Sequence, residues 1–204
     1  MTGEKPAGFG AYYAATRDGA PRKTLLRALD AFDADPVREP RFAVDLGCGT
    51  GRDTVELLRR GWSVLAIDAE ASAIAELAAR PEAAAAGVRL QTRVARFEAE
   101  TLPGADLVNS SFALPLCPPE QFPALWQRIR AALAPGGRFA GQIFGPRDSW
   151  AARTPPITIH DSDGVDALLA GMAVEMLEEE ETDSITPRGQ TKHWHIFHVV
   201  ARKR

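Results

Sequence analysis

The chain has 204 residues, of which 45% are hydrophobic and 25% charged, and its formal net charge at pH 7 is −3. This size and balance favour one globular domain, residues 1–204, built around a single hydrophobic core. The acidic balance argues against nucleic acid as the main partner, because surfaces that follow phosphates are usually basic. The chain also lacks the run of about 18 apolar residues that a membrane-spanning helix requires.

Helical and extended segments alternate through residues 21–144. The predicted elements are, in chain order, a helix at 21–33, a strand at 42–46, a helix at 50–60, a strand at 63–67, an alanine-rich helix at 71–86 interrupted near Pro81, strands at 88–94 and 105–110, a helix at 119–133 that Pro135-Gly136-Gly137 ends, and a strand at 138–144. Such alternation predicts an α/β fold, with a parallel sheet covered by helices on both faces.

The last third of the chain changes character. A proline-rich loop at 145–156 is followed by a short predicted helix at 162–169 and two predicted strands at 173–183 and 192–201. Between these strands lies Pro187-Arg188-Gly189, which is a hairpin signal. The acidic run Glu178–Glu181 predicts a solvated strand edge, because charges there discourage pairing with another strand.

One loop carries the strongest functional signal. The sequence Val-Asp-Leu-Gly-Cys-Gly-Thr-Gly-Arg-Asp at 44–53 joins a short apolar strand to a helix. Glycine has no Cβ, so a ligand can lie against such a loop, and the first turn of the helix offers free N–H groups. The dinucleotide pattern G-x-G-x-x-G would require a glycine at Arg52. The loop therefore predicts a nucleotide or nucleoside site of another kind; the alternative is a tight turn without a ligand.

A second acidic residue follows at the distance expected for a nucleoside site. Asp68 ends the predicted strand at 63–67 and lies 17 residues after Gly51, close to the roughly 20 expected for an acid that binds a ribose. A carboxylate there accepts hydrogen bonds from both ribose hydroxyls and repels a 2′-phosphate. The alternative role is a cap for the helix that begins near Ser72, although Ser72 itself suffices as that cap.

The two cysteines point to a reducing compartment. Cys48 and Cys117 lie far apart and outside any C-x-x-C motif, so we expect reduced thiols in a cytoplasmic protein. The first ten residues hold no apolar core of signal-peptide type. Within the glycine loop, Cys48 is expected to be a small filler rather than a nucleophile.

These motifs together resemble the class I S-adenosylmethionine (SAM)-dependent methyltransferases. The D-x-G-x-G-x-G loop resembles motif I of that family, residues 105–110 resemble its fourth strand, and residues 133–139 (Leu-Ala-Pro-Gly-Gly-Arg-Phe) resemble its turn into the fifth strand. The resemblance implies a Rossmann-like fold, whose mostly parallel, seven-stranded sheet has helices on both faces and an antiparallel C-terminal hairpin. It also divides the one domain into an N-terminal lid and helix (1–34), a SAM-binding core (41–144) and an acceptor-side section (145–204).

Within the family, the likeness is to the tellurite-resistance, TehB-like branch. Three segments carry it: Tyr12-Tyr13, Gly51-Arg52-Asp53 and Lys192-His193-Trp194-His195. The sequence departs from the pattern at two places. Arg96-Phe97-Glu98 stands where the family usually has an aspartate near the adenine, so Phe97 is expected to pack on that ring and Glu98 or a backbone group to accept its amino proton. Thr182-Asp183 stands where this branch carries a His-Arg pair, which counts against tellurite itself as the acceptor.

The resemblance implies SAM as methyl donor and S-adenosylhomocysteine (SAH) as product. Asp45 and the glycine loop are expected to hold the amino-acid tail, with Asp45 favouring its ammonium, and Asp68 is expected to hold the ribose. Asn109 and Ser110 are expected to face the tail or the sulfonium, because ligands of open α/β sheets lie beyond the carboxyl ends of the strands. The candidate cofactor-binding residues are Tyr13, Arg17, Asp45, Gly47, Cys48, Gly49, Gly51, Arg52, Asp68, Ala69, Arg96, Phe97, Glu98, Asn109 and Ser110.

The N-terminal segment and the long loop supply candidates for the acceptor side. Tyr12, Tyr13 and Arg17 are expected either to fold over the cofactor as a lid or to form an ordinary amphipathic segment. Trp150 and Arg153, in the loop at 145–156, are candidates for an acceptor pocket, with surface packing as the alternative.

The last predicted strand supplies two histidines. His193 and His195 share one face of it, while Trp194, Ile196 and His198 share the other. A metal site is not expected, because zinc requires three or four ligands. Together with Tyr13, these two histidines are the candidate catalytic residues, since histidine titrates near neutrality; the alternative is that one of them is a packed strand residue.

The sequence therefore predicts SAM-dependent methyl transfer, by in-line displacement, to a small-molecule acceptor such as a thiol or a metalloid oxyanion. A thiolate or an oxyanion needs no general base, whereas an alcohol or a protonated nitrogen does. Two alternatives stay open: a methyltransferase for a macromolecule, which predicts a contiguous basic surface that the sequence does not show, and a non-catalytic SAM-binding module, which predicts a blocked acceptor side. A dehydrogenase is disfavoured by the missing G-x-G-x-x-G.

Overall fold

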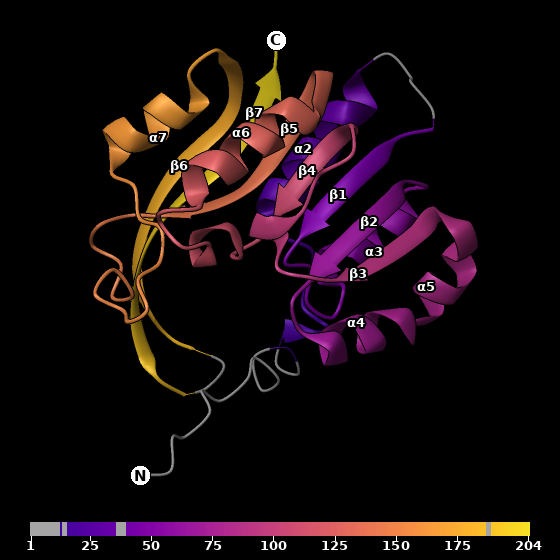
Figure 1. Ribbon diagram of the computed structural model, residues 1–204, viewed down its shortest axis with the longest axis horizontal. Helices are drawn as coiled ribbons and strands as arrows, with labels where there is room; N and C mark the ends of the chain where they lie inside the picture. Colours follow the sequence, from indigo (N-terminus) through magenta and orange to yellow (C-terminus); the bar gives the residue numbers. More distant parts are fainter. Residues whose placement is uncertain (1–12, 14–15, 36–39, 187–188) are drawn as a thin grey trace.

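A seven-stranded sheet forms the centre of the structure, a computed structural model that describes residues 13, 16–35, 40–186 and 189–204 (Figure 1). The strands are β1 Phe42–Leu46, β2 Ser63–Asp68, β3 Leu90–Val94, β4 Ala105–Ser110, β5 Leu133–Phe144, β6 Met172–Ile185 and β7 Thr191–Lys203. Their order across the sheet is β3-β2-β1-β4-β5-β7-β6. The first five pair in parallel, and β7 pairs antiparallel with both β5 and β6. The predicted mostly parallel sheet with an antiparallel C-terminal hairpin is confirmed.

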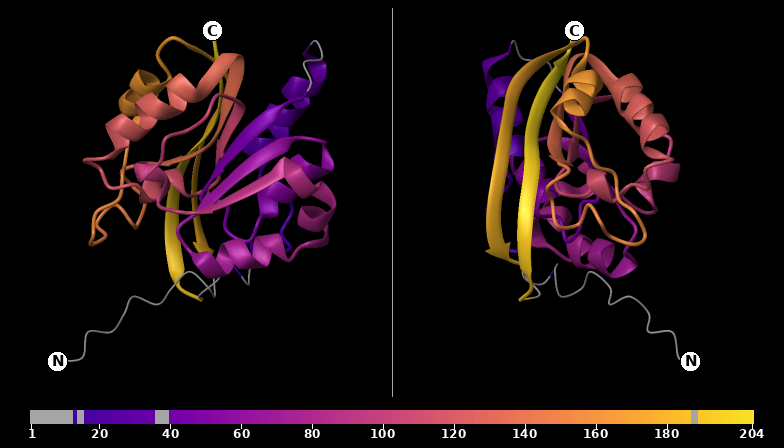
Figure 2. Two further views of the ribbon diagram at one scale, coloured as in Figure 1. Left: turned by 45° about the vertical axis from the view of Figure 1, so that its right-hand side comes forward. Right: turned by 90° about the vertical axis from the view of Figure 1, so that its left-hand side faces the viewer.

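Helices cover both faces of this sheet, as predicted. They are α2 Lys23–Ala34, α3 Arg52–Arg59, α4 Ala71–Ala78, α5 Pro81–Ala86, α6 Phe122–Ala132 and α7 Ser162–Leu169. The edge-on view of Figure 2 shows α2 and α6 on opposite sides of the sheet. Successive residues of a strand point to opposite faces of the sheet and pack in different hydrophobic cores. In β1, Ala43 packs with α2 and α3, and Val44 packs with α6 and α7. Because both faces are covered, the central strands are apolar almost throughout.

Proline and glycine cause the main differences between the predicted and observed elements. Strand β5 begins at Leu133 rather than at Arg138, since Leu133 pairs with Ala105 before Pro135-Gly136-Gly137 interrupts the register. The helix predicted at 71–86 is divided into α4 and α5, because Pro81 begins a new helix at its first position. The other predicted boundaries lie within three residues of those observed.

The C-terminal hairpin places β7 inside the sheet and β6 at its edge. The acidic run Glu178–Glu181 on β6 is largely exposed and pairs with cations such as Lys23 and Arg147. The predicted solvated strand edge is therefore confirmed. The structure shows in addition that this edge forms ion pairs with neighbouring elements. Pro187 and Arg188 of the predicted turn lie outside the described residues.

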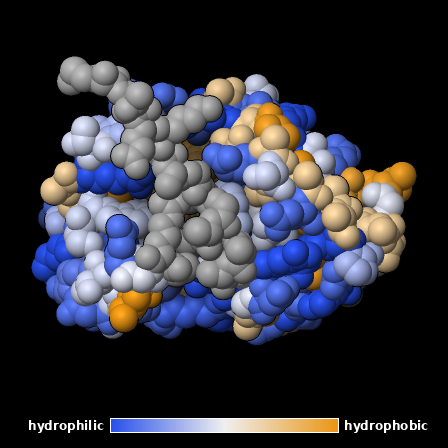
Figure 3. Space-filling model, turned by 90° about the horizontal axis from the view of Figure 1, so that it is seen from below, coloured by the Kyte–Doolittle hydropathy of each residue, from blue (hydrophilic) through white to orange (hydrophobic). Residues whose placement is uncertain are grey.

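The carboxyl ends of β1, β2 and β4 meet at one end of the sheet, on either side of the point where the strand order reverses between β1 and β4. Ligands of open α/β sheets bind at such a point. Seen from below, most of the described surface is hydrophilic, and apolar residues gather mainly toward one side (Figure 3). None of the described helices has both the length and the apolar character needed to cross a membrane.

Candidate cofactor and acceptor site

The glycine loop after β1 has an unusual backbone. Gly47, Gly49 and Gly51 have φ angles of 70°, 53° and 87°, in the left-handed region that favours glycine. A Cβ on Gly47 would lie 2.2 Å from the Cβ of Ala113, and one on Gly51 would lie 2.3 Å from Cδ1 of Leu77. The first and third glycines thus permit close packing, and the loop backbone lines the smaller of two adjoining cavities.

Two buried carboxylates lie in this smaller cavity. Asp45, in β1, accepts hydrogen bonds from Thr54 Oγ1 (2.6 Å) and Asn109 Nδ2 (2.9 Å). Asp53, in the first turn of α3, accepts from Asn109 Nδ2 (3.3 Å) and from Ser111 Oγ (2.5 Å). Burial, and then the charge of Asp53, raise the pKa of Asp45 to about 7. A cationic group between these carboxylates would favour the charged form of Asp45.

Two arginines supply positive charge to the same cavity. The backbone N–H of Arg22 donates to Asp53 Oδ1 (3.0 Å), and its guanidinium carbon lies 4.3 Å from the centre of the Phe112 ring. Arg52 also lines the cavity, and its Nε donates to the carbonyl of Ala20 (2.6 Å). Carboxylates and guanidinium groups around one small volume match the zwitterionic end of an amino acid.

Asp68 links the glycine loop to the N-terminal segment. Its Oδ2 accepts from the N–H of Gly49 (2.8 Å), and its Oδ1 accepts from the N–H of Glu70 (2.9 Å) and from the Tyr13 hydroxyl (3.2 Å). Burial and the Asp68 charge raise the pKa of Tyr13 above its ordinary value. The tyrosine therefore stays protonated and donates to Asp68, as a ribose hydroxyl would.

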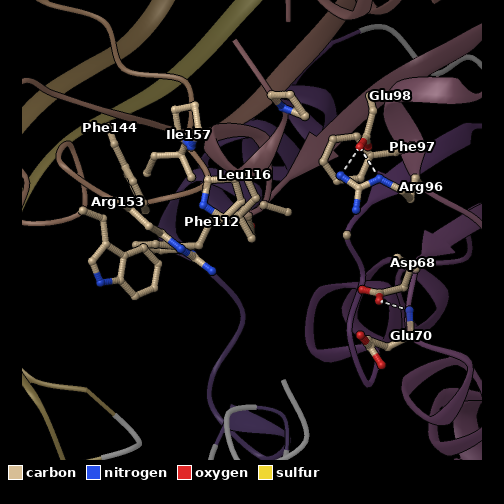
Figure 4. Close-up of a pocket in the computed structure, with 18 of the residues that line it drawn as sticks. Asp68, Glu70, Arg96, Phe97, Glu98, Phe112, Leu116, Phe144, Arg153 and Ile157 are labelled. Atoms are coloured by element: carbon tan, nitrogen blue, oxygen red, sulfur yellow. Dashed lines mark hydrogen bonds and ion pairs between the residues drawn. The ribbon is translucent and has the colours of Figure 1, made fainter. Parts of the chain in front are cut away.

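A larger cavity of about 420 Å³ begins at the same loop (Figure 4). One side of it is formed by residues 68–70 after β2 and residues 96–98 after β3. There, Arg96 Nε donates to Glu98 Oε1 (2.6 Å), and Phe97 is buried beside the glycine loop. An aromatic ring and a carboxylate thus lie on the wall next to Asp68, where the sequence predicted an adenine.

The other side of the larger cavity is mainly aromatic and aliphatic. Figure 4 shows Phe112, Phe144 and Ile157 across the cavity from Asp68 and Glu70. Phe112 has a φ of 59°, the one positive φ among the described residues that are not glycine. Its N–H donates to Gln142 Oε1 (2.9 Å). Strained residues of this kind occur at functional sites, and here the strain fixes an aromatic ring close to the boundary of the two cavities.

The two cavities adjoin at Tyr13, Gly47 and Ser111, which line both of them. Tyr13, a candidate lid and catalytic residue, is thus part of the junction. Trp150 and Arg153, the acceptor-pocket candidates, line the larger cavity. Tyr12 lies outside the described residues.

Four candidate cofactor residues line neither cavity. Gly51 packs against α4, and Asn109 supports the two carboxylates through its side-chain amide. The Ser110 hydroxyl donates to the carbonyl of Leu46 (3.2 Å). Arg17 lies on the surface, 3.9 Å from Glu76. For Ser110 this corrects the expectation, because its side chain turns toward β1 and the next residue, Ser111, faces the cavities.

Both candidate catalytic histidines also lie away from the cavities, which favours the alternative that one of them is a packed strand residue. His195 is buried, with its Nε2 2.8 Å from Glu179. His193 is partly exposed, and its hydrogen bond to Asp183, the largest of several causes, raises its pKa. The alternation along β7 was predicted correctly. However, the face that carries Trp194 is the one that lines the cavity.

Asp53, Ser111 and Arg22 line the smaller cavity but were not among the site residues predicted from the sequence. The sequence did contain a signal for Asp53, because this residue lies in the first turn of the helix that follows motif I. Cys48 lines this cavity with a pKa raised by burial, so its thiol stays protonated, as expected of a filler. Within the described ranges, no group of three or more histidine, cysteine or acidic side chains is placed to hold a metal ion.

Comparisons with known proteins show what the sequence and the fold are similar to. Residues 43–137 match a family profile described as a methyltransferase domain. They contain most of β1, all of β2–β4, the glycine loop and Asp68. The match covers just under half of the chain, and it relates these residues to methyltransferases. No curated protein matches the sequence.

Solved structures of methyltransferases share the fold of the chain. TehB from Haemophilus influenzae is 17% identical, with a TM-score of 0.76 over 95% of this chain and 67% of that protein. Magnesium protoporphyrin IX methyltransferase from Synechocystis, with bound SAM, is 16% identical, with a TM-score of 0.68 over 98% and 92%. A 1,6-didemethyltoxoflavin-N1-methyltransferase from Burkholderia thailandensis, with SAH and its substrate bound, is 22% identical, with a TM-score of 0.62 over 96% and 85%. At these identities the likeness establishes the fold and leaves the acceptor open.

Proposed function

We propose that the protein binds SAM across the two adjoining cavities and transfers its methyl group to a small organic acceptor. The observation that carries this proposal is the junction at Tyr13, Gly47 and Ser111. A ligand that passes this point has one end among the carboxylates of the smaller cavity and the other beside Asp68. SAM has that form, with an amino-acid tail and an adenosine joined at one sulfur.

The smaller cavity fits the tail. Asp45 and Asp53 supply buried acceptors for the ammonium, and Arg22 and Arg52 supply cations for the carboxylate. The backbone of the glycine loop lets the tail approach closely. We expect Asn109 to hold both carboxylates in position through its side-chain amide rather than to touch the ligand.

The larger cavity fits the nucleoside on its polar side. Asp68 already accepts a hydrogen bond from the Tyr13 hydroxyl, so we expect ribose hydroxyls to replace or join that donor. Phe97 and Glu98 offer a ring and a carboxylate for the adenine. The cavity then continues past Ser111 to Phe112 and the aromatic side. A non-catalytic SAM-binding module with a closed acceptor side is therefore not favoured.

The protein contributes alignment and the exclusion of water. SAM supplies an electrophilic methyl group, whose bond to sulfur breaks with its electron pair left on sulfur as a lone pair of the acceptor forms the new bond. Holding both reactants in line lowers the barrier by up to roughly 7–11 kcal/mol in favourable cases. The Tyr13 hydroxyl, whose pKa is raised, is a donor at neutral pH and not a base. We expect acceptors whose nucleophilic atom already carries a free lone pair.

Calorimetry with SAH and with NAD tests the proposal on the intact chain. We expect SAH to bind, NAD to give no heat, and Asp68→Ala to weaken SAH at least tenfold, since a buried carboxylate that accepts ribose hydroxyls is lost. Asp163→Ala, on the exposed first turn of α7, is the matched control and should bind as the wild type does. Tight NAD binding without SAH binding would disprove the proposal, and an unchanged SAH affinity in Asp68→Ala would move the ribose contact elsewhere.

A further inference from the structure

Four aromatic rings pack together on the acceptor side of the larger cavity, in a cluster that we call the aromatic box. Phe112 follows β4, Phe144 ends β5, Trp150 lies in the loop after β5, and Trp194 lies in β7. The neighbouring ring centres are between 5.8 and 6.3 Å apart, in edge-to-face or tilted arrangements. Aromatic pairs prefer these geometries. Segments far apart in the sequence thus converge on one packed aromatic wall of the larger cavity.

A buried ion pair holds two of these rings in place. The Lys192 side chain is 1% exposed and pairs with the buried Asp148. Its ammonium nitrogen lies 4.1 Å from the centre of the Trp194 ring and 4.3 Å from that of Trp150. Asp148 also accepts a hydrogen bond from the N–H of Trp150 (2.8 Å). The aromatic wall is therefore formed before any ligand arrives, which lowers the entropic cost of binding.

One exposed cation lies at the edge of this box. The guanidinium carbon of Arg153 is 5.4 Å from the centre of the Trp150 ring. Among the described residues, no carboxylate pairs with it, whereas Arg96 on the opposite side pairs with Glu98. Figure 4 shows Arg153 reaching toward the cavity, with Glu70 and Glu98 on the far side. Glu120 also lines the cavity and is exposed.

From this arrangement we infer that the methyl acceptor is a flat aromatic or heteroaromatic molecule that carries an anionic group. Its ring packs against the cavity-facing side of Phe112, Phe144, Trp150 and Trp194, and its anion pairs with Arg153. The inference rests on the proposed function and names the acceptor class of the same site. A metalloid oxyanion does not fit this wall, because a small hydrated anion would exchange water for aromatic carbon, and of the two arginines that line the larger cavity Arg96 already pairs with Glu98.

Binding of matched probes to the intact, SAH-loaded protein tests the inference. The probes are 2-naphthoate, the neutral 2-naphthalenemethanol with the same ring system, and sodium tellurite, each titrated by calorimetry. We expect 2-naphthoate to bind about tenfold more tightly than the alcohol, as one charge-assisted hydrogen bond to an arginine implies. We expect no heat from tellurite.

Variants distinguish the contribution of Arg153 to binding from that of the aromatic box. Arg153→Gln should remove the preference for 2-naphthoate and leave SAH binding unchanged. Arg147→Gln, in the same loop but paired with Glu179 and Glu181, should keep the preference. Equal binding of the two naphthalenes to the wild type, an unchanged preference in Arg153→Gln, or tellurite binding without naphthalene binding would each overturn the inference. Failure of SAH itself to bind is a separate result and would count against the proposed function.

Discussion

Asp45 carries the clearest residue-scale consequence of the site. It shares the hydrogen bonds of Asn109 with Asp53, and its burial raises its pKa to about 7. Near neutral pH, part of the population is therefore protonated when the cavity holds no cation. An ammonium group favours the charged carboxylate, so a ligand with this group has to displace that proton.

We expect the affinity for SAH to fall as the pH falls below about 7, with up to one proton released per SAH bound, and to be nearly flat above that pH. The sign follows from the raised pKa: the site without ligand holds a proton below 7, and the bound state does not. Calorimetry in buffers of different ionisation enthalpy measures the released proton. Asp45→Asn should remove the slope and lower the affinity.

A ligand without the tail is the control for this prediction. 5′-Methylthioadenosine has the nucleoside of SAH but no ammonium, so its affinity should show no such slope. An SAH affinity that stays constant between about pH 5.5 and 8, or proton uptake on binding, would contradict the assignment of the ammonium to Asp45.

At this scale, the sequence predicted residues whose signal is local. Asp45 is the second-last residue of an apolar strand and Asp68 the last residue of another. The glycines that follow Asp45 indicate a backbone that a ligand can approach closely, so the place of these residues at the site could be inferred. Ser111 and Arg22 join the site only because β1 and β4 are neighbours and the segment before α2 passes over their ends. The spacing of residues in a single sequence does not reveal such a contact between distant segments.

Among the elements, the glycine loop depends on α4 for its packing. Gly51 precedes α3 with a φ of 87°, and a Cβ there would lie 2.3 Å from Cδ1 of Leu77 in α4. Gly61 follows α3 with a φ of 85°, and a Cβ there would meet no atom within 4 Å. A side chain at either position would strain the backbone, whereas only a side chain at Gly51 would also collide with a neighbouring residue.

We expect Gly61→Ala to lower the free energy of unfolding by about 1 kcal/mol, through backbone strain alone. Gly51→Ala should lower it by about 2–4 kcal/mol, because the new methyl group also displaces Leu77. Urea denaturation of the two variants measures the difference. Equal losses would mean that α4 yields freely and does not fix the loop.

The histidines show where element-scale prediction stops. Alternation along a strand assigned His193 and His195 to one face and Trp194 to the other, and this assignment is correct. Which face borders the cavity depends on what packs against each side of β7. The loop that carries Trp150 and the ring of Phe144 cover the Trp194 face. Likewise, β5 begins early because its first residue pairs with β4. The strand propensity of the neighbouring residues does not reveal such a long-range pairing.

Across the whole molecule, one buried arginine joins the hairpin to the parallel core. Arg138, in β5, has a side chain that is 2% exposed, and its guanidinium carbon lies 4.3 Å from the centre of the Phe32 ring in α2. It donates to both carboxylate oxygens of Glu175 in β6 (2.6 and 2.9 Å) and to Asp35 at the end of α2 (2.7 Å). One buried guanidinium group thus connects the edge strand β6, the strand β5 and the helix α2.

We expect Glu175→Gln to lower the free energy of unfolding by about 2–4 kcal/mol, since it keeps the shape of the side chain and leaves the buried guanidinium with one carboxylate. Glu178→Gln is the matched control on the same strand. Glu178 is 57% exposed and pairs with Lys23 at 2.9 Å, so its loss should cost less than about 1 kcal/mol. Denaturant unfolding followed by circular dichroism measures both. If the two substitutions cost the same, the Arg138 network does not hold the hairpin to the core, and the aliphatic packing between β5, β7 and β6 must do so alone.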